Sequence, residues 1–198
     1  MENLTNHNSL VVQQKKEWGE ILVGFEQKNK YAVMSEDGDD VYFAAEEGGS
    51  TLVRLFLKGL RPFTMVVLTR DGKRLLQLKR PFRFFFYKLN VFEEGGGRLG
   101  SIERKFAIFR RLYSVKDEKD QEIYQLFGPI LHPWTFKIQN DGNELGKITK
   151  EWSGLMKEMF TKADNFGIVF PADATNRVKG LLLGAVFLID FAHFETKN

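Results

Sequence analysis

The C-terminal run over residues 178–194 constrains the fold more than any other segment, because it is apolar on every face of a helix. Its unbroken apolar part, residues 181–189, covers only about 14 Å at about 1.5 Å per residue, whereas a bilayer span needs about 20 apolar residues. Asp190 ends that part, and a helix that is apolar all round must be buried. Two environments could bury this run: the rest of the protein, which we favour, or a bilayer that the run crosses once.

Short apolar segments separated by turn signals predict a β-rich fold before this run. Three Asp-Gly pairs lie between strand-like segments: Asp37-Gly38, Asp71-Gly72 and Asp141-Gly142. Asp-Gly supplies the positive φ of a two-residue type I′ hairpin. Phe136 and Ile138 alternate with polar residues, which is the period-2 pattern of a half-buried strand. The 19 phenylalanines also suit pleated, half-buried positions. Repeated hairpins of this kind favour an antiparallel sandwich or barrel.

A closed antiparallel barrel would give the apolar run a host. About ten or more strands make a barrel wide enough to enclose a helix, which would then meet inward-facing Phe and Leu side chains. We therefore predict a mainly β fold, a closed barrel around a C-terminal helix over 178–194. Asp190 is expected near a barrel mouth, in a buried polar pair with His193. Residues 1–16 are predicted to be a short polar segment, and residues 17–198 a single domain.

The composition excludes several functional classes. The chain has no cysteine, which rules out a disulfide framework, a thiolate zinc site and a cysteine nucleophile, and is compatible with the reducing cytoplasm. Residues 1–16 have no secretory pattern. His7, His132 and His193 show no metal-ligand spacing, and no serine nucleophile motif occurs, so we do not predict an enzyme. A net charge of +3 falls far short of a nucleic-acid-binding arm, so nucleic acid is not a predicted partner.

Several blocks of the sequence resemble the phospholipid scramblase family. They lie at residues 24–31, 41–46, 61–64, 80–83, 146–152, 163–168 and 187–191, in the family's order over nearly the whole chain. The resemblance implies a tubby-like fold, a closed antiparallel barrel of about twelve strands around a hydrophobic C-terminal helix. It also implies calcium-stimulated movement of phospholipids between leaflets. The alternative is a tubby-like soluble module that binds lipid headgroups or a protein partner and transports nothing.

A basic and aromatic segment over residues 73–88 is the candidate contact with phospholipids and an anionic membrane surface. Relatives often carry acyl-anchored cysteines near this point, and this chain has none. We expect headgroup contacts from Arg80, Arg83 and Lys88, each contributing about 1 kcal/mol. In place of the acyl anchors of the relatives, the rings of Phe84 and Phe86 are expected to be buried shallowly at the headgroup level. This predicts peripheral membrane association. The alternative is that these rings fill the barrel core.

The calcium expectation falls on residues 162–173, which align with the family's acidic loop. Asp164 and Asp173 occupy positions 3 and 12 of a calcium loop, but Lys162 stands at position 1 where an oxygen ligand is needed. The only cofactor we consider is therefore Ca²⁺, with an affinity of about millimolar. The alternative for this segment is a plain strand over residues 166–170.

Overall fold

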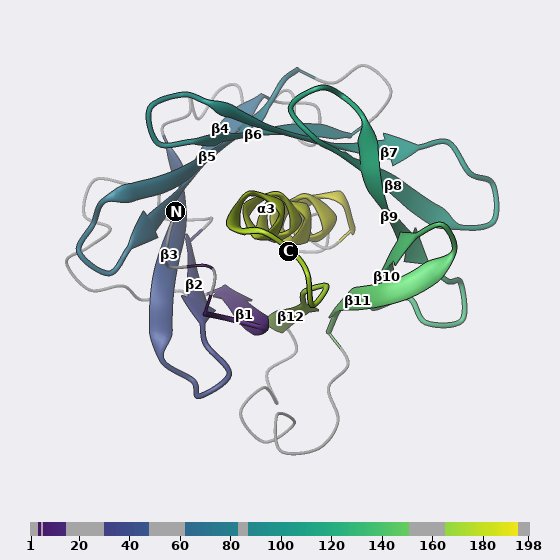
Figure 1. The fold of residues 1–198 in the computed structure, drawn as a ribbon, viewed down its shortest axis with the longest axis horizontal. Coiled ribbons are helices and arrows are strands. Elements are labelled where there is room, and N and C mark those ends of the chain that lie inside the picture. Colours follow the sequence, from purple (N-terminus) through teal and green to yellow (C-terminus); the bar gives the residue numbers. More distant parts are fainter. Residues whose placement is uncertain are drawn as a thin grey trace.

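The protein is a closed antiparallel barrel in which every strand pairs with its neighbours in sequence and the first strand pairs with the last. The computed structural model describes residues 4, 6–14, 30–47, 62–82, 87–150 and 165–193. Within them the strands are β1 (Ser9–Gln14), β2 (Lys30–Met34), β3 (Asp40–Glu47), β4 (Phe63–Thr69), β5 (Arg74–Arg80), β6 (Lys88–Glu93), β7 (Arg98–Lys105), β8 (Arg111–Lys116), β9 (Glu122–Gly128), β10 (Thr135–Asn140), β11 (Asn143–Thr149) and β12 (Asn165–Val169). Helix α3 (Asn176–His193) lies inside the ring of strands (Figure 1). The predicted fold class is confirmed.

The barrel buries α3 on all sides. Residues 181–189 are all buried, and Phe187 packs edge-to-face on Tyr31 of β2 with ring centroids 5.2 Å apart. The helix begins after Thr175, whose hydroxyl accepts a hydrogen bond from the backbone N–H of Val178 at 3.4 Å, as an N-cap does. No helix in the described part of the chain is long and apolar enough to cross a membrane. The host of the apolar run is thus the protein's own sheet.

The hairpin predictions hold in position but only partly in turn type. The turn at Asp141-Gly142 has positive φ at both residues, 47° and 81°, as a two-residue type I′ turn requires. At the other two Asp-Gly pairs, only Gly38 and Gly72 have positive φ. There the N–H of the glycine bonds back to Ser35 or Thr69 in a four-residue turn. The type I′ prediction is wrong for these two, because a type I turn followed by a left-handed glycine closes a longer connection equally well.

Strand β1 lies within residues 1–16, the segment predicted to be a polar tail. It pairs with β12 on one side and β2 on the other, so this segment supplies the strand that closes the barrel. Leu10, Val11 and Val12 are at most 2% exposed. The three consecutive apolar residues explain this placement, because both faces of β1 are covered.

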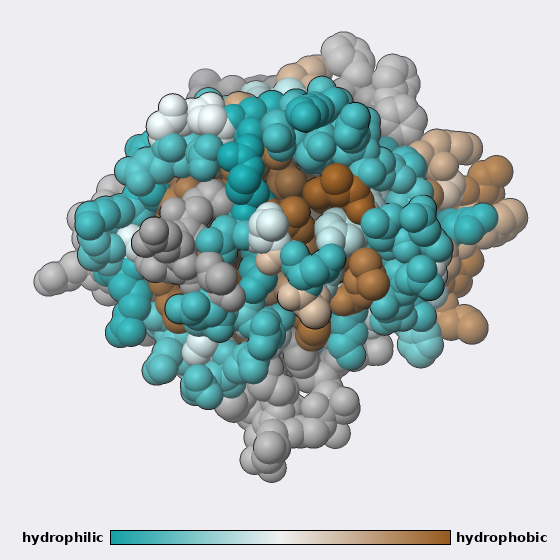
Figure 2. Space-filling view, in the orientation of Figure 1, coloured by the Kyte–Doolittle hydropathy of each residue, from teal (hydrophilic) through white to brown (hydrophobic). Residues whose placement is uncertain are grey.

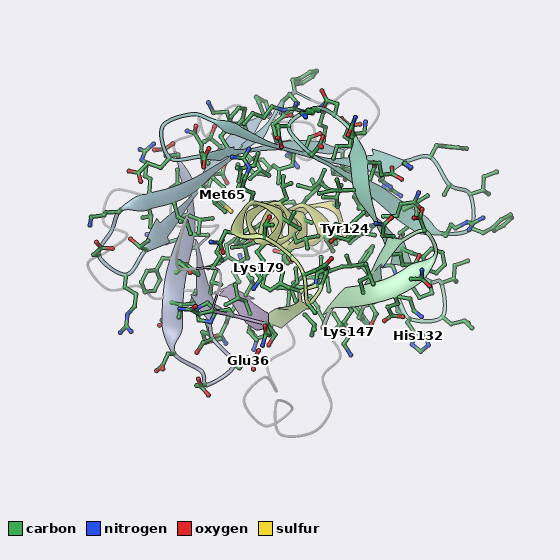
Figure 3. The ribbon with its side chains drawn as sticks, in the orientation of Figure 1. Glu36, Met65, Tyr124, His132, Lys147 and Lys179 are labelled. Carbon is green, nitrogen blue, oxygen red and sulfur yellow. The ribbon has the colours of Figure 1, made fainter. Side chains whose placement is uncertain are left out.

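The two ends of the barrel differ because connections between antiparallel strands alternate between them. One end, here called the hairpin mouth, carries the turns β2–β3, β4–β5, β6–β7, β8–β9 and β10–β11. It holds the start of α3, where Lys179 donates a hydrogen bond to the His7 carbonyl at 2.7 Å (Figure 3). The other end, here called the loop mouth, carries the connections β5–β6, β7–β8 and β9–β10 together with the end of α3.

Close packing of α3 on β6 gives a first prediction. A Cβ atom added at Gly184 would lie 3.0 Å from Val91 Cγ2, which is closer than an ordinary van der Waals contact of 3.4–4 Å. Gly184→Val should therefore lower the free energy of unfolding by about 1–3 kcal/mol through overpacking, although replacing a helical glycine normally stabilises a helix. Urea unfolding measures this. The control Leu145→Val, on exposed β11, should change it by less than about 0.5 kcal/mol; equal stability of both variants would contradict the packing.

Candidate lipid-contacting site

The end of α3 carries two polar side chains, and each meets a tyrosine of the barrel wall. Tyr31 of β2 donates a hydrogen bond from Oη to Asp190 Oδ2 at 2.8 Å. Tyr113 of β8 shares a hydrogen bond with His193 Nε2 at 2.7 Å. The helix is thereby tied to two different strands at the loop mouth. Asp190 lies near a mouth as predicted, and a direct Asp190–His193 pair stays a prediction.

His193 is held in its neutral form. Burial, followed by the positive charges of Arg111 and Arg104, lowers its pKa from 6.5 to about 4. The ring also lies against the Phe136 ring, with centroids 5.7 Å apart. At neutral pH the imidazole is therefore an uncharged hydrogen-bond partner for Tyr113, and protonating it would place a cation among two others.

This depressed pKa predicts acid sensitivity. Between pH 6.5 and about 4 the unfolded chain takes up a proton at His193 that the folded chain does not, so stability falls as pH falls through this window. After allowance for partial solvent screening the loss is about 1–2 kcal/mol. Urea midpoints at pH 7 and pH 4.5 measure it. His193→Gln cannot titrate, so it should lose less stability between pH 7 and pH 4.5 than the unaltered protein, by the amount that His193 contributes. An equal loss in the two proteins would contradict the lowered pKa of His193.

Arg80, predicted to contact headgroups, lies at the loop mouth but is only 3% exposed. The register of β4 and β5 places it opposite Phe63, and its guanidinium lies 4.4 Å from the Phe63 ring centroid. Phe63 in turn packs on Phe191 of α3 at 4.5 Å. Arg80 therefore ties the barrel wall to the helix as well as carrying charge.

A cavity of about 500 Å³ opens beside this stack. Its lining includes Arg80, Lys79, Thr64 and Asn90, all of which carry hydrogen-bond donors, together with Glu47. Lys79 is exposed and its ammonium lies 5.1 Å from the Phe92 ring centroid. The Glu47 carboxylate, on β3, is engaged by Arg74 of β5. Two cations and two neutral donors around one opening make a chemically suitable site for a phosphate-bearing headgroup.

The other predicted lipid-contact residues are placed differently. Lys88 forms an ion pair with Glu103 at 2.6 Å, and Lys116 pairs with the same carboxylate at 2.7 Å. The positive charge of Lys88 is thus partly compensated by Glu103 on the outer face of the barrel. Arg83, Phe84 and Phe86 lie outside the described residues, so their contacts with lipid stay predictions.

The segment aligned with a calcium loop is largely a strand. Residues 165–169 form β12, hydrogen-bonded to β1 and β11, which confirms the alternative of a plain strand there. Asp173 is exposed in the turn before α3, and the whole of β12, about 13 Å long, lies between it and Asn165. No group of three His, Cys, Asp or Glu side chains able to hold a metal occurs among the described residues. Asp164 lies outside them, so the calcium pair stays a prediction.

The sequence prediction missed a set of exposed apolar side chains at the loop mouth. They are Phe82, Phe106, Ile108, Phe109, Ile130, Leu131 and Trp134. The available signal was the absence of polar alternation in residues 106–109, which is unusual for a connection between strands.

The comparisons with known proteins identify the family of the chain. The family model described as Scramblase matches residues 1–196. Bovine phospholipid scramblase 2 is 33% identical, covering 98% of the chain and 71% of that protein. Rat phospholipid scramblase 1 is 33% identical over 98% of the chain and 62% of its own length, and the human protein is 30% identical over 99% and 66%. No solved structure matches the chain. The chain belongs to the scramblase family.

Proposed function

We propose that this protein binds phospholipids at a membrane surface and moves them between the two leaflets. The names of the relatives give the class of activity. The observation that carries the proposal for this chain is the cationic cavity beside the end of α3. Lys79 and Arg80 supply positive charge there, and Thr64 and Asn90 add neutral hydrogen-bonding groups.

The filled interior limits how such an activity can work. In the part of the chain that the structure describes, helix α3 and the inward side chains of the strands are buried along the length of the barrel and leave no path for lipid through its centre. A phospholipid would instead meet the protein at its outer surface, with its phosphate at the cavity and its acyl chains left in the bilayer. Transferring a headgroup through hydrocarbon is costly because its charge loses solvation. Cations that pair with the phosphate reduce that cost.

A second candidate function is a binding module without transport, and the same filled barrel favours it. Such a module would hold a lipid headgroup or a protein partner at the loop mouth while the sheet stays rigid. The proposed phosphate contacts come from side chains of the protein, and stimulation by calcium through Asp164 and Asp173 stays a prediction.

Reconstitution tests the two functions. Liposomes containing a fluorescent phospholipid are exposed to a membrane-impermeant quencher, with and without calcium. Transport predicts complete quenching only when protein is present, whereas quenching of about half the signal in every condition leaves the binding module.

A charge reversal tests the cavity in the same assay. Lys79→Glu should slow lipid movement about tenfold, because one charge-assisted contact is replaced by repulsion. Lys119→Glu changes an exposed lysine of the β8–β9 turn at the hairpin mouth and serves as the matched control. Equal rates for the two variants would contradict the role of the cavity.

A further inference from the structure

The connections β7–β8 and β9–β10 expose apolar side chains that the barrel does not bury. We call this set the apolar rim: Phe106, Ile108, Phe109, Ile130, Leu131 and Trp134. Leu131 is 88% exposed, Phe106 79% and Phe109 77%. Figure 2 shows brown surface at the right-hand edge, over the place these two connections occupy in Figure 1. Contiguous apolar surface of this kind marks a contact with another molecule or a membrane.

The rim is held in shape by one half-buried cation. Arg111, the first residue of β8, donates hydrogen bonds to the carbonyls of Pro129, His132 and Pro133 in the β9–β10 connection. Its guanidinium also lies 4.5 Å from the Phe136 ring centroid. The two connections therefore form one preorganised surface. Figure 3 shows His132, which lies between these rim residues in the β9–β10 connection, at the outer edge of the molecule and away from α3.

The rim carries positive charge and no carboxylate. The sequence has no acid between Glu103 and Asp117, nor between Glu122 and Asp141. Exposed Arg110 forms no ion pair within the described part of the chain. Arg104 faces the Tyr87 ring at 5.8 Å, and no carboxylate of the described residues pairs with it. Cations interleaved with exposed aromatic and aliphatic groups match the headgroup level of an anionic bilayer.

A second copy of the chain fits this surface less well. A symmetric contact through the rim would bring the unpaired arginines of both copies together, and like charges across an interface are strongly unfavourable. A bilayer of anionic lipid offers the opposite charge and an apolar layer at the same depth.

We propose that the apolar rim inserts into the interface of an anionic phospholipid bilayer, with Arg104 and Arg110 at the headgroups. This deepens the proposed function, on which it rests for the identity of the partner. Insertion would turn the loop mouth toward the membrane. The cavity beside Arg80 and the end of α3 open at that same mouth, so headgroups would be brought to them. Phe82, 44% exposed in the β5–β6 connection, lies at this mouth as well.

Single-site labelling measures insertion directly, because the chain contains no native cysteine. Ile108→Cys and Glu94→Cys are each labelled with a polarity-sensitive fluorophore and mixed with phosphatidylcholine vesicles, with or without phosphatidylserine. Glu94 is exposed in the β6–β7 turn at the hairpin mouth and is the matched control. The label at position 108 should shift to the blue and be quenched by lipids with a spin label in the acyl chain. The label at position 94 should do neither. Equal responses at the two positions would overturn the proposal.

Vesicle co-sedimentation supplies an independent readout. The double variant Ile108→Ser/Phe109→Ser should bind phosphatidylserine vesicles at least about tenfold more weakly, and Arg110→Glu about tenfold more weakly at low salt. Leu145→Ser and Arg70→Glu are matched controls away from the rim and should bind as the unaltered protein does. All four variants change exposed positions only, and thermal melts verify folding.

The outcomes separate this inference from the proposed function. Vesicle binding that depends on the rim, without lipid movement, supports insertion and contradicts transport. Vesicle binding and lipid movement that both persist in the rim variants support transport and contradict insertion. A loss of self-association in Ile108→Ser/Phe109→Ser, with unchanged vesicle binding, would identify the rim as a contact between copies and overturn the proposal.

Discussion

Burial of α3 inside the sheet is the interaction on which the rest of the structure depends. The helix has no polar face, so water cannot stabilise it, and the strands need a filled interior because inward side chains alone leave a wide barrel underpacked. Gly180 and Gly184 allow the helix to approach β5, β6 and β7 closely. Polar groups occur at its ends, where Lys179 meets a carbonyl and Asp190 meets Tyr31. Helix and barrel therefore require each other, and neither leaves a channel.

A barrel without a lumen must act through its surface, and its two ends differ in chemistry. The hairpin mouth is formed by short polar turns, and Arg177 there bonds to Glu93 and Glu118 around the start of the helix. The loop mouth combines exposed apolar side chains, unpaired arginines and a cationic cavity. The proposed insertion would use this asymmetry to turn the loop mouth toward the membrane.

The sequence predicted the architecture well because its signals are local or nearly so. Asp-Gly turns, the alternation around Phe136 and the length of the apolar run each depend on a few neighbouring residues. The candidate site was harder, because its properties arise from pairs distant in sequence. Arg80 was expected at headgroups, and only the register opposite Phe63 shows that it is buried in a stack reaching Phe191. Residues 106–109 resemble a core strand in composition, and their exposure follows from their place between β7 and β8.

The most direct test of this structure is whether the barrel shields α3 from solvent when the protein is in water. Ala185 is fully buried, and Ala185→Cys would introduce the sole thiol of the chain with little change in volume. In buffer without detergent, this thiol should react with a maleimide only when urea unfolds the protein, whereas Leu145→Cys on the surface should react at once. Equal reactivity of the two thiols in the folded protein would show that the barrel does not enclose the helix.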